Sequence, residues 1–291
     1  MYRFCVMMVV GLGLTSSAAA QKLDLEQIEE SIRYINDLQN SDGAFRPAAT
    51  DRQSDLGATS SALRAIKYLH PRARPRDKQG PVLYVEKCYD ASTGSFRNRP
   101  DGTADVRTTA MGLMAMAELK MPTDKHAAAI TGYFAANAKT VPDIYIAAAS
   151  LAAAEIKTPK ATDWIAEFDR LRQADGTYGK DAFESAGAAI TILRLGGELK
   201  DPLAVADQLL AAQRADGGFG RADQPSDLTT TYRVMRAIHM LKRKPDVARC
   251  RGFIARCRNE DGGYGVSPGQ PSSTSATYFA AIVMHWLDEA D

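Results

Sequence analysis

Hydrophobic residues follow two alternating patterns along the chain, and both predict α-helices. Segments of the first kind place apolar residues at helical spacing with charged residues between them, as from Leu25 to Ile35 and from Trp164 to Leu171. Segments of the second kind are rich in alanine, glycine, threonine and serine, as in "LGATSSALRAI" and "SAGAAITILRL". Small residues let a helix pack closely on several sides, so we expect the second kind to form a buried inner layer and the first kind an outer layer.

The small-residue segments have similar beginnings. They start near Asp55, Asp105, Asp143, Glu184, Asp227 and Ser273. Most of these residue types suit a helix N-cap or first turn, where they meet the positive end of the helix dipole. The sequence therefore predicts six inner helices.

A short turn separates the two kinds of helix and recurs along the chain. The copies are "QNSDGAF", "STGSF", "QADGTY", "QRADGGF" and "RNEDGGY", with glycines at 43, 94, 176, 217 and 262. The glycine spacings are 51, 82, 41 and 45 residues, and 82 is twice 41. We therefore expect a sixth, degenerate unit in the long gap, at "KTVPDIYIAAASLAAAEI" from Lys139. The glycines suit a left-handed backbone at the helix C-terminus.

Six such units indicate a repeat architecture. The predicted fold class is all-α, with six helical hairpins in inner and outer layers that close into an α/α toroid. All inner helices would then run parallel, so that six N-termini, each with partial positive charge, open on one rim.

Bulk composition limits the partners and the location. The chain is 45% hydrophobic and 24% charged with a formal net charge of +1, which gives no electrostatic case for nucleic acid. Residues 1–20 have the pattern of a signal peptide, with Arg3, an apolar run and a cleavage site at Ala20. We expect an exported protein, periplasmic or secreted, whose single toroid domain covers 21–291, with no transmembrane span.

The cysteines and histidines do not indicate a disulfide or a metal site. Cys88, Cys250 and Cys257 remain after the signal segment, and an i,i+7 pair on one helix is too far apart to bridge. The four histidines match no metal-ligand spacing. We expect the cysteines to pack as small hydrophobic residues.

The glutamine, glycine and aromatic turn followed by a threonine- or alanine-rich helix resembles a known repeat. It is similar to the repeat of protein prenyltransferase β-subunits, most like those of geranylgeranyltransferase type II, and of squalene and other terpene cyclases. The resemblance covers essentially the whole chain after residue 20 and implies the α/α toroid. It also suggests an isoprenoid or another apolar chain in the central cavity.

The resemblance implies a zinc site only if its ligands are present, and most are replaced. The arginine and aspartate of the family's zinc-site run match Arg221 and Asp227, but Gln224, Thr229 and Thr230 stand where the family has lysine, cysteine and tyrosine. Ala276 stands at the position of the zinc-binding histidine. A threonine hydroxyl does not replace a thiolate, so we expect no zinc and no other cofactor. The cyclase acid motif D-x-D-D is also absent.

The predicted rim carries charged residues that allow two further interpretations. Its arginines are Arg46, Arg52, Arg97, Arg99, Arg107 and Arg221, which either bind an anionic ligand or pair with Asp55, Asp101, Asp105 and Asp227. Two rim carboxylates are alternatively the acid and base of a carbohydrate-active barrel. The candidate ligand-binding residues are Arg221, Asp227, Thr229, Tyr232, Arg107 and Asp105.

Two functions follow from the sequence. The first is a prenyltransferase-like toroid that holds an isoprenoid or another apolar or anionic ligand, with transferase activity left open and the catalytic residues unknown. The second is an exported, non-catalytic protein that binds a peptide, glycan or lipid. Because export separates the chain from cytosolic prenyl diphosphates, we expect no α-subunit partner.

Overall fold

A computed structural model of the protein describes residues 22–290. Helices dominate this part of the chain, and the only strands are a two-residue antiparallel pair, β1 (Tyr89–Asp90) and β2 (Ser95–Phe96). The outer helices are α1 (Leu25–Asp37), α3 (Gly80–Cys88), α5 (Asp124–Asn137), α7 (Ala161–Asp169), α9 (Pro202–Ala211) and α11 (Val247–Arg256). The inner helices are α2 (Leu56–Leu69), α4 (Val106–Glu118), α6 (Val141–Ala153), α8 (Ala182–Arg194), α10 (Leu228–Met240) and α12 (Thr274–Ala290).

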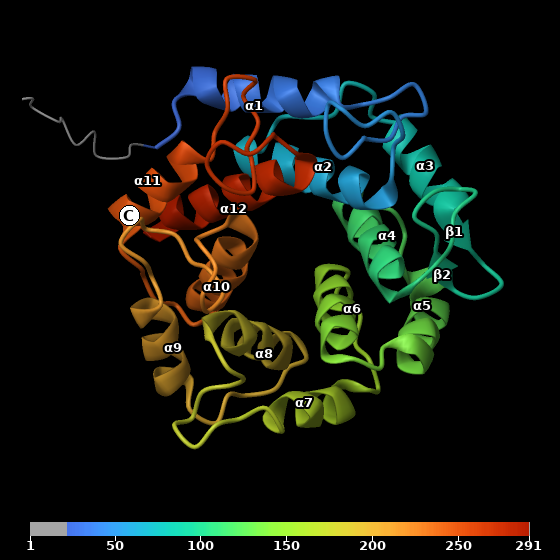
Figure 1. Cartoon of the computed structure of the whole chain (residues 1–291). Helices are drawn as coiled ribbons and strands as arrows, with labels where there is room; N and C mark the ends of the chain where they lie inside the picture. The colour runs from blue at the N-terminus through green and yellow to red at the C-terminus, as the bar shows by residue number, and fades with distance from the viewer. Residues whose placement is uncertain (1–21, 291) are drawn as a thin grey trace, which may run out of the picture.

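The inner helices form a closed ring. Each one contacts the next in chain order, and α12 returns to contact α2. The outer helices surround this ring (Figure 1). The predicted all-α fold, an α/α toroid of six helical hairpins, is confirmed.

Small residues allow the inner helices to pack in this ring. In α4, a side chain at Gly112 would overlap the ring of Phe96, which lies behind the helix. Alanines are buried throughout the layer, for example Ala110, Ala147 and Ala188. The inner helices are thus enclosed by neighbours on both sides and by the outer layer behind.

The repeated turn holds five of the six inner helices through its aromatic residue. Phe45 is fully buried, and its backbone N–H donates a hydrogen bond to the Thr59 hydroxyl of α2, at 3.0 Å. The other four copies make the same bond to a hydroxyl of their own inner helix, through Thr109, Ser185, Thr231 and Thr277. Much of the hydroxyl content of the inner helices therefore serves the fold.

The turn glycine lies farther from the helix than the sequence predicts. Helix α1 ends at Asp37, and Gly43 comes later, inside a turn closed by a bridge between Gln39 and Phe45. Its φ of +84° confirms the predicted left-handed backbone. The site also lacks room for a side chain, because the backbone of Gly80 at the start of α3 contacts it.

The structure settles which position Asp143 and Glu184 occupy. Both lie in the first turns of α6 and α8, whose N-caps are Thr140 and Asp181. The pattern alone did not distinguish the two positions, because acidic residues are favoured at both. The degenerate sixth unit is present as α5 and α6, without the aromatic turn.

The predicted signal segment, residues 1–20, lies outside the described residues. Within 22–290, no helix is long and apolar enough to cross a membrane. Cys88, Cys250 and Cys257 are buried free thiols, and burial raises the pKa of each to about 12.

Candidate functional site in the central cavity

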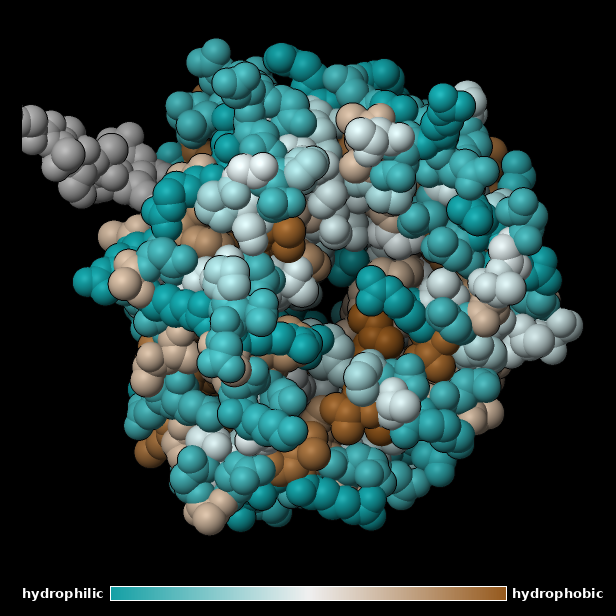
Figure 2. Space-filling view, viewed as in Figure 1, coloured by the Kyte–Doolittle hydropathy of each residue, from teal (hydrophilic) through white to brown (hydrophobic). Residues whose placement is uncertain are grey.

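The inner helices enclose a central cavity of about 930 Å³. Figure 2 shows an opening at the centre of one face of the ring, with hydrophobic residues beside it where Figure 1 places α6. Residues from five inner helices, together with Arg194 at the end of α8, line this cavity. A ligand of this size would contact most of the ring.

Four arginines reach this cavity from the interior or the C-terminal end of inner helices. They are Arg64 of α2, Arg194 of α8, and Arg233 and Arg236 of α10. Helical side chains tilt toward the N-terminus of their helix, so these guanidinium groups point back toward the middle of the cavity. Sequence analysis missed all four, although an arginine inside a small-residue helix was a signal that could have revealed them.

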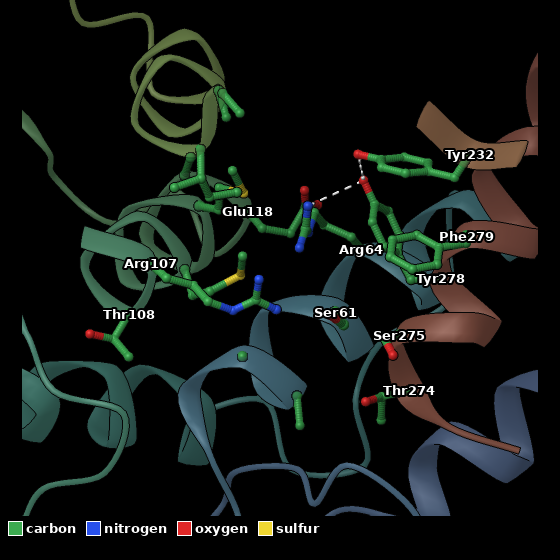
Figure 3. A pocket seen from close by; sticks show the side chains of 18 of the residues that line it. Ser61, Arg64, Arg107, Thr108, Glu118, Tyr232, Thr274, Ser275, Tyr278 and Phe279 are labelled. Carbon is green, nitrogen blue, oxygen red and sulfur yellow. Dashed lines mark hydrogen bonds between the residues drawn. The ribbon is translucent and has the colours of Figure 1, made fainter. Parts of the chain in front are cut away.

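Two of the arginines converge on a pair of tyrosines. Arg64 donates to the Tyr278 hydroxyl at 3.2 Å and stacks over its ring at 4.2 Å (Figure 3). Arg236 donates through Nε to the Tyr232 hydroxyl at 3.2 Å and through a second nitrogen to Tyr278 at 3.4 Å. The two hydroxyl oxygens are 3.3 Å apart.

A second stack leads from the rim into the cavity. Arg233 lies between the rings of Phe183 and Tyr145, at 3.7 Å and 4.2 Å from their centroids. The guanidinium group of Arg221 also lies over the Phe183 ring, 3.8 Å from its centroid. These cation–π contacts hold the guanidinium groups without neutralising their charge.

The cavity arginines have no carboxylate partner among the described residues. No Asp or Glu oxygen lies within 4.0 Å of the guanidinium nitrogens of Arg64, Arg194, Arg233 or Arg236 in this part of the protein. The ion pair on the cavity wall joins Lys67 to Glu118 at 3.0 Å. These partly buried charges lie close together without a counter-ion, which is unfavourable, so this cluster favours an anion.

The tyrosine pair responds to this charge in opposite ways. Burial raises the pKa of Tyr232, but Arg236, Arg194 and Arg64 outweigh it and lower the pKa to about 7. Burial raises the pKa of Tyr278 well above its ordinary value, and the neighbouring Tyr232 adds to this. Burial also lowers the pKa of Arg194, next to Arg236. The pair therefore favours one ionised and one protonated hydroxyl.

The structure divides the six candidate residues that the sequence indicates. Asp105, Arg107, Thr229 and Tyr232 line the cavity. Arg221 stacks on Phe183 instead.

The rim aspartates are used as helix caps. Asp55 and Asp105 accept backbone N–H bonds from Ala58 and Thr108, each at 2.6 Å. Burial raises the pKa of Asp55. The predicted pairing of rim arginines with Asp55, Asp101, Asp105 or Asp227 is not found within the described chain, where Arg97 pairs with Asp90.

The residues at the family's zinc position do not fit a zinc ion. Both carboxylate oxygens of Asp227 accept from Thr230, one from its N–H at 2.8 Å and the other from its hydroxyl at 2.7 Å. Thr229 and the buried Ala276 supply no thiolate or imidazole. Across residues 22–290 no group of three His, Cys, Asp or Glu side chains is arranged to hold a metal.

The comparisons agree with this architecture. A family model described as the prenyltransferase alpha-alpha toroid domain matches residues 2–196 and 144–291. The chain belongs to this family. A search of curated proteins gave no match for this prenyltransferase toroid.

Solved structures share the toroid at low identity. Candida albicans protein geranylgeranyltransferase-I complexed with GGPP is 12% identical, with a TM-score of 0.70, and the match covers 93% of each chain. A type II terpene cyclase from Scytonema, in complex with its product merosterolic acid A, is 14% identical with a TM-score of 0.63, covering 91% of this chain and 96% of the cyclase. A glycosidase in complex with glucose is 13% identical with a TM-score of 0.58, covering 91% and 96%. At these identities the likeness shows the fold alone.

Proposed function

We propose that this prenyltransferase toroid is a binding protein whose central cavity takes a ligand with an anionic group and an apolar part. The observation that carries the proposal is the partly buried cluster of Arg64, Arg194, Arg233 and Arg236, which has no contacting carboxylate in the described chain. Guanidinium groups bind phosphate, sulfate and carboxylate through charge-assisted hydrogen bonds. The rings of Tyr68, Tyr145 and Phe279 and the methionines of α4 supply apolar contact around them.

An isoprenoid phosphate ester has both parts. Structural relatives of this chain are complexed with GGPP or with a terpenoid product, which supports this ligand class. Zinc-dependent transfer to a thiol is not part of the proposal, because the donor set at Asp227 and Thr229 does not fit the metal. The protein would act alone, without an α-subunit.

Calorimetric titration tests this function. Geranylgeranyl diphosphate is compared with geranylgeraniol, which lacks the charge, and with inorganic diphosphate, which lacks the chain. We expect the ester to bind more tightly than either fragment. Arg194→Gln should weaken ester binding by about tenfold or more, because one charge-assisted contact is lost. Arg170→Gln is the matched control, since Arg170 is exposed on the outer helix α7 and pairs with Glu167.

Equal affinities for the ester and the alcohol, or an unchanged affinity in Arg194→Gln, would contradict the proposal. Retention of a peptide or an uncharged glycan in protein purified from its own cells would favour the alternative binder.

We also propose that the protein is exported after cleavage near Ala20, as the signal pattern of residues 1–20 predicts. Mass spectrometry of the protein from fractionated cells checks this. The expected mature N-terminus is at or near Gln21, in the exported fraction. An intact Met1 in the cytoplasmic fraction is the opposite result.

A carbohydrate hydrolase is a second candidate. Asp55 and Asp105 both line the cavity, and burial raises the pKa of Asp55 as a general acid requires. Asp55→Asn keeps an N-cap oxygen but removes the acid, so it should abolish hydrolysis of a responsive glycoside with little loss of stability. Absence of hydrolysis by the unaltered protein on a broad glycoside panel rejects this candidate.

A further inference from the structure

We propose that the hydroxyl pair of Tyr232 and Tyr278, with the arginines around it, forms the anion-binding subsite of the cavity and takes up a proton from solvent when an anion binds. This inference rests on the proposed function, because it specifies where the anionic group of the ligand lies and what accompanies its binding.

The hydroxyl pair is the focus of the hydrogen bonds in the cavity. Tyr278 accepts from Arg64 and from Arg236 and is hydrogen-bonded to the Tyr232 hydroxyl, while Tyr232 accepts from Arg236. Cationic donors that point at a hydroxyl oxygen favour its ionised form. Figure 3 shows Arg64 and the hydroxyl groups of the two tyrosines next to one another, joined by hydrogen bonds.

Charged and titratable groups from five of the six inner helices line the same cavity as this pair. They are Arg64, Lys67 and Tyr68 from α2, Arg107 and Glu118 from α4, Tyr145 from α6, Arg194 from α8, Arg233 and Arg236 from α10, and the helix-capping Asp55 and Asp105 at the rim. Glu118 is engaged by Lys67, and the two aspartates cap helices. Within the described chain, a phenolate in this hydroxyl pair is therefore the negative group in direct contact with the arginine cluster.

The arginines hold this phenolate at neutral pH. Burial raises the pKa of Tyr232, and Arg236, Arg194 and Arg64 together lower it to about 7. The phenolate acts as an internal counter-ion that neutralises part of the positive charge of the arginine cluster.

An entering anion competes with this internal counter-ion. It engages the same guanidinium groups and adds negative charge beside the phenolate, and both effects raise the pKa of Tyr232. Above pH 7 the phenolate oxygen then binds a proton from the buffer, forming the neutral hydroxyl while the anion takes over its charge. By linkage, anion affinity falls as pH rises through the pKa of the free protein, by up to about tenfold per pH unit. A neutral Tyr232 is then a hydrogen-bond donor to the bound anion.

Sulfate is the probe for this subsite because its own charge does not change between pH 6 and 9. Sulfate is titrated calorimetrically into the full mature chain near pH 8, in two buffers that differ in ionisation enthalpy. We expect the two observed heats to differ by an amount equivalent to most of one proton taken up per sulfate. Repeated titrations from about pH 6 to about pH 9 should show the affinity falling as pH rises.

Two tyrosine variants separate the subsite from general charge effects. Tyr232→Phe should still bind sulfate, with proton uptake abolished and affinity nearly independent of pH. Tyr68→Phe is the matched control, because Tyr68 lines the same cavity and lies 6.3 Å from Tyr278 between ring centroids without a hydrogen bond to the pair. It should behave like the unaltered protein. Circular dichroism establishes that both variants are folded.

The outcomes distinguish failure of this inference from failure of the proposed binding function. Sulfate binding without proton uptake, or an equal pH dependence in Tyr232→Phe, overturns the inference and leaves the binding function standing. Failure of sulfate and of the diphosphate ester to bind at any pH overturns both.

Discussion

At the scale of single residues, identity alone did not reveal the role of a side chain in this toroid. Thr231 of α10 accepts the N–H of Phe219 and so supports the repeat turn, whereas Thr229, two positions earlier, faces the cavity. Tyr232 is again different, because it lies among Arg64, Arg194 and Arg236. Neighbouring positions on one inner helix therefore contact either the repeat turn or the cavity.

The ionisation of Tyr232 predicts a pH-dependent contribution to stability. The pKa of Tyr232 is lowered to about 7 in the folded protein, whereas a tyrosine in an unfolded chain titrates near about pH 10. Folding thus favours the deprotonated form, so the contribution is complete above about pH 10 and is lost as pH falls through about 7. As pH rises from about 6 to about 9, the free energy of unfolding of the natural chain should increase relative to that of Tyr232→Phe.

Urea denaturation at both pH values measures this difference. Titrating groups that do not contact Tyr232 are the same in the two proteins, so their effects cancel. A stability difference that stays constant with pH would show that Tyr232 remains protonated.

At the scale of the element, a repeat unit depends on its turn glycine and on its cap. Gly217 has a φ of +87°, and the backbone of Arg249 in α11 fills the space that a side chain would need. The cap Asp227 then starts α10 and places Thr229 and Tyr232 at the cavity.

Gly217→Ala should lower the free energy of unfolding by about 2 kcal/mol or more, because it combines a left-handed alanine with a backbone overlap. Gly132→Ala in α5 is the control, since no atom lies within 4 Å of the added group. It should raise stability by about 0.5–1 kcal/mol through helix propensity. Thermal and urea unfolding measure both changes. Equal effects of the two substitutions would refute the argument from close packing.

The cap explanation of Asp227 has its own test. Asp227→Ala should cost about 1 kcal/mol of stability, while Asp227→Asn should cost much less because an amide oxygen also caps the helix. Both variants should bind the diphosphate ester like the natural protein, as measured by calorimetry. A loss of binding in Asp227→Asn at unchanged stability would give the carboxylate a direct role in the site.

At the scale of the whole molecule, the ring closes through contacts between the first and last units. Helix α12 packs against α2, and the Ser31 hydroxyl of α1 donates to the Gly262 carbonyl at 2.7 Å. Lys22 lies 3.9 Å from Asp288, so the two ends of the described chain are close together. The arginine cluster depends on this closure, because Arg64 comes from α2 and its partner Tyr278 from α12.

A circular permutant should therefore keep the fold. A short glycine-serine linker joins residues 22 and 290, and new ends are opened between Lys157 and Thr158 in the loop after α6, where Lys157 is exposed. We expect its helix content and cooperative thermal unfolding to resemble those of the natural chain. A chain truncated after Leu241, which lacks α11 and α12, should lose cooperative unfolding because α2 and α10 lose their neighbour. Circular dichroism and calorimetry compare the two, and a cooperatively folded truncation would contradict the closed-ring argument.

The sequence by itself determined the helical repeat. The spacing of the turn glycines, the small residues of one helix type and the amphipathic pattern of the other are local properties, and local backbone preferences act on them directly. They fixed the all-α class and the six units, including the degenerate unit at Lys139. Whether Asp143 and Glu184 cap their helices or lie in the first turns was left open, because both positions favour the same acidic side chains.

Only the tertiary structure decided the site. An inner helix carries small residues on all of its faces, so its sequence does not show which face meets the cavity. Arg64 and Arg194 also belong to helices on different sides of the ring, and only closure brings their charges to the same tyrosine pair. Local pattern therefore predicts where a helix begins and ends, whereas the electrostatic character of the cavity arises from charges that are distant in sequence and become close, and poorly screened by water, when the ring closes.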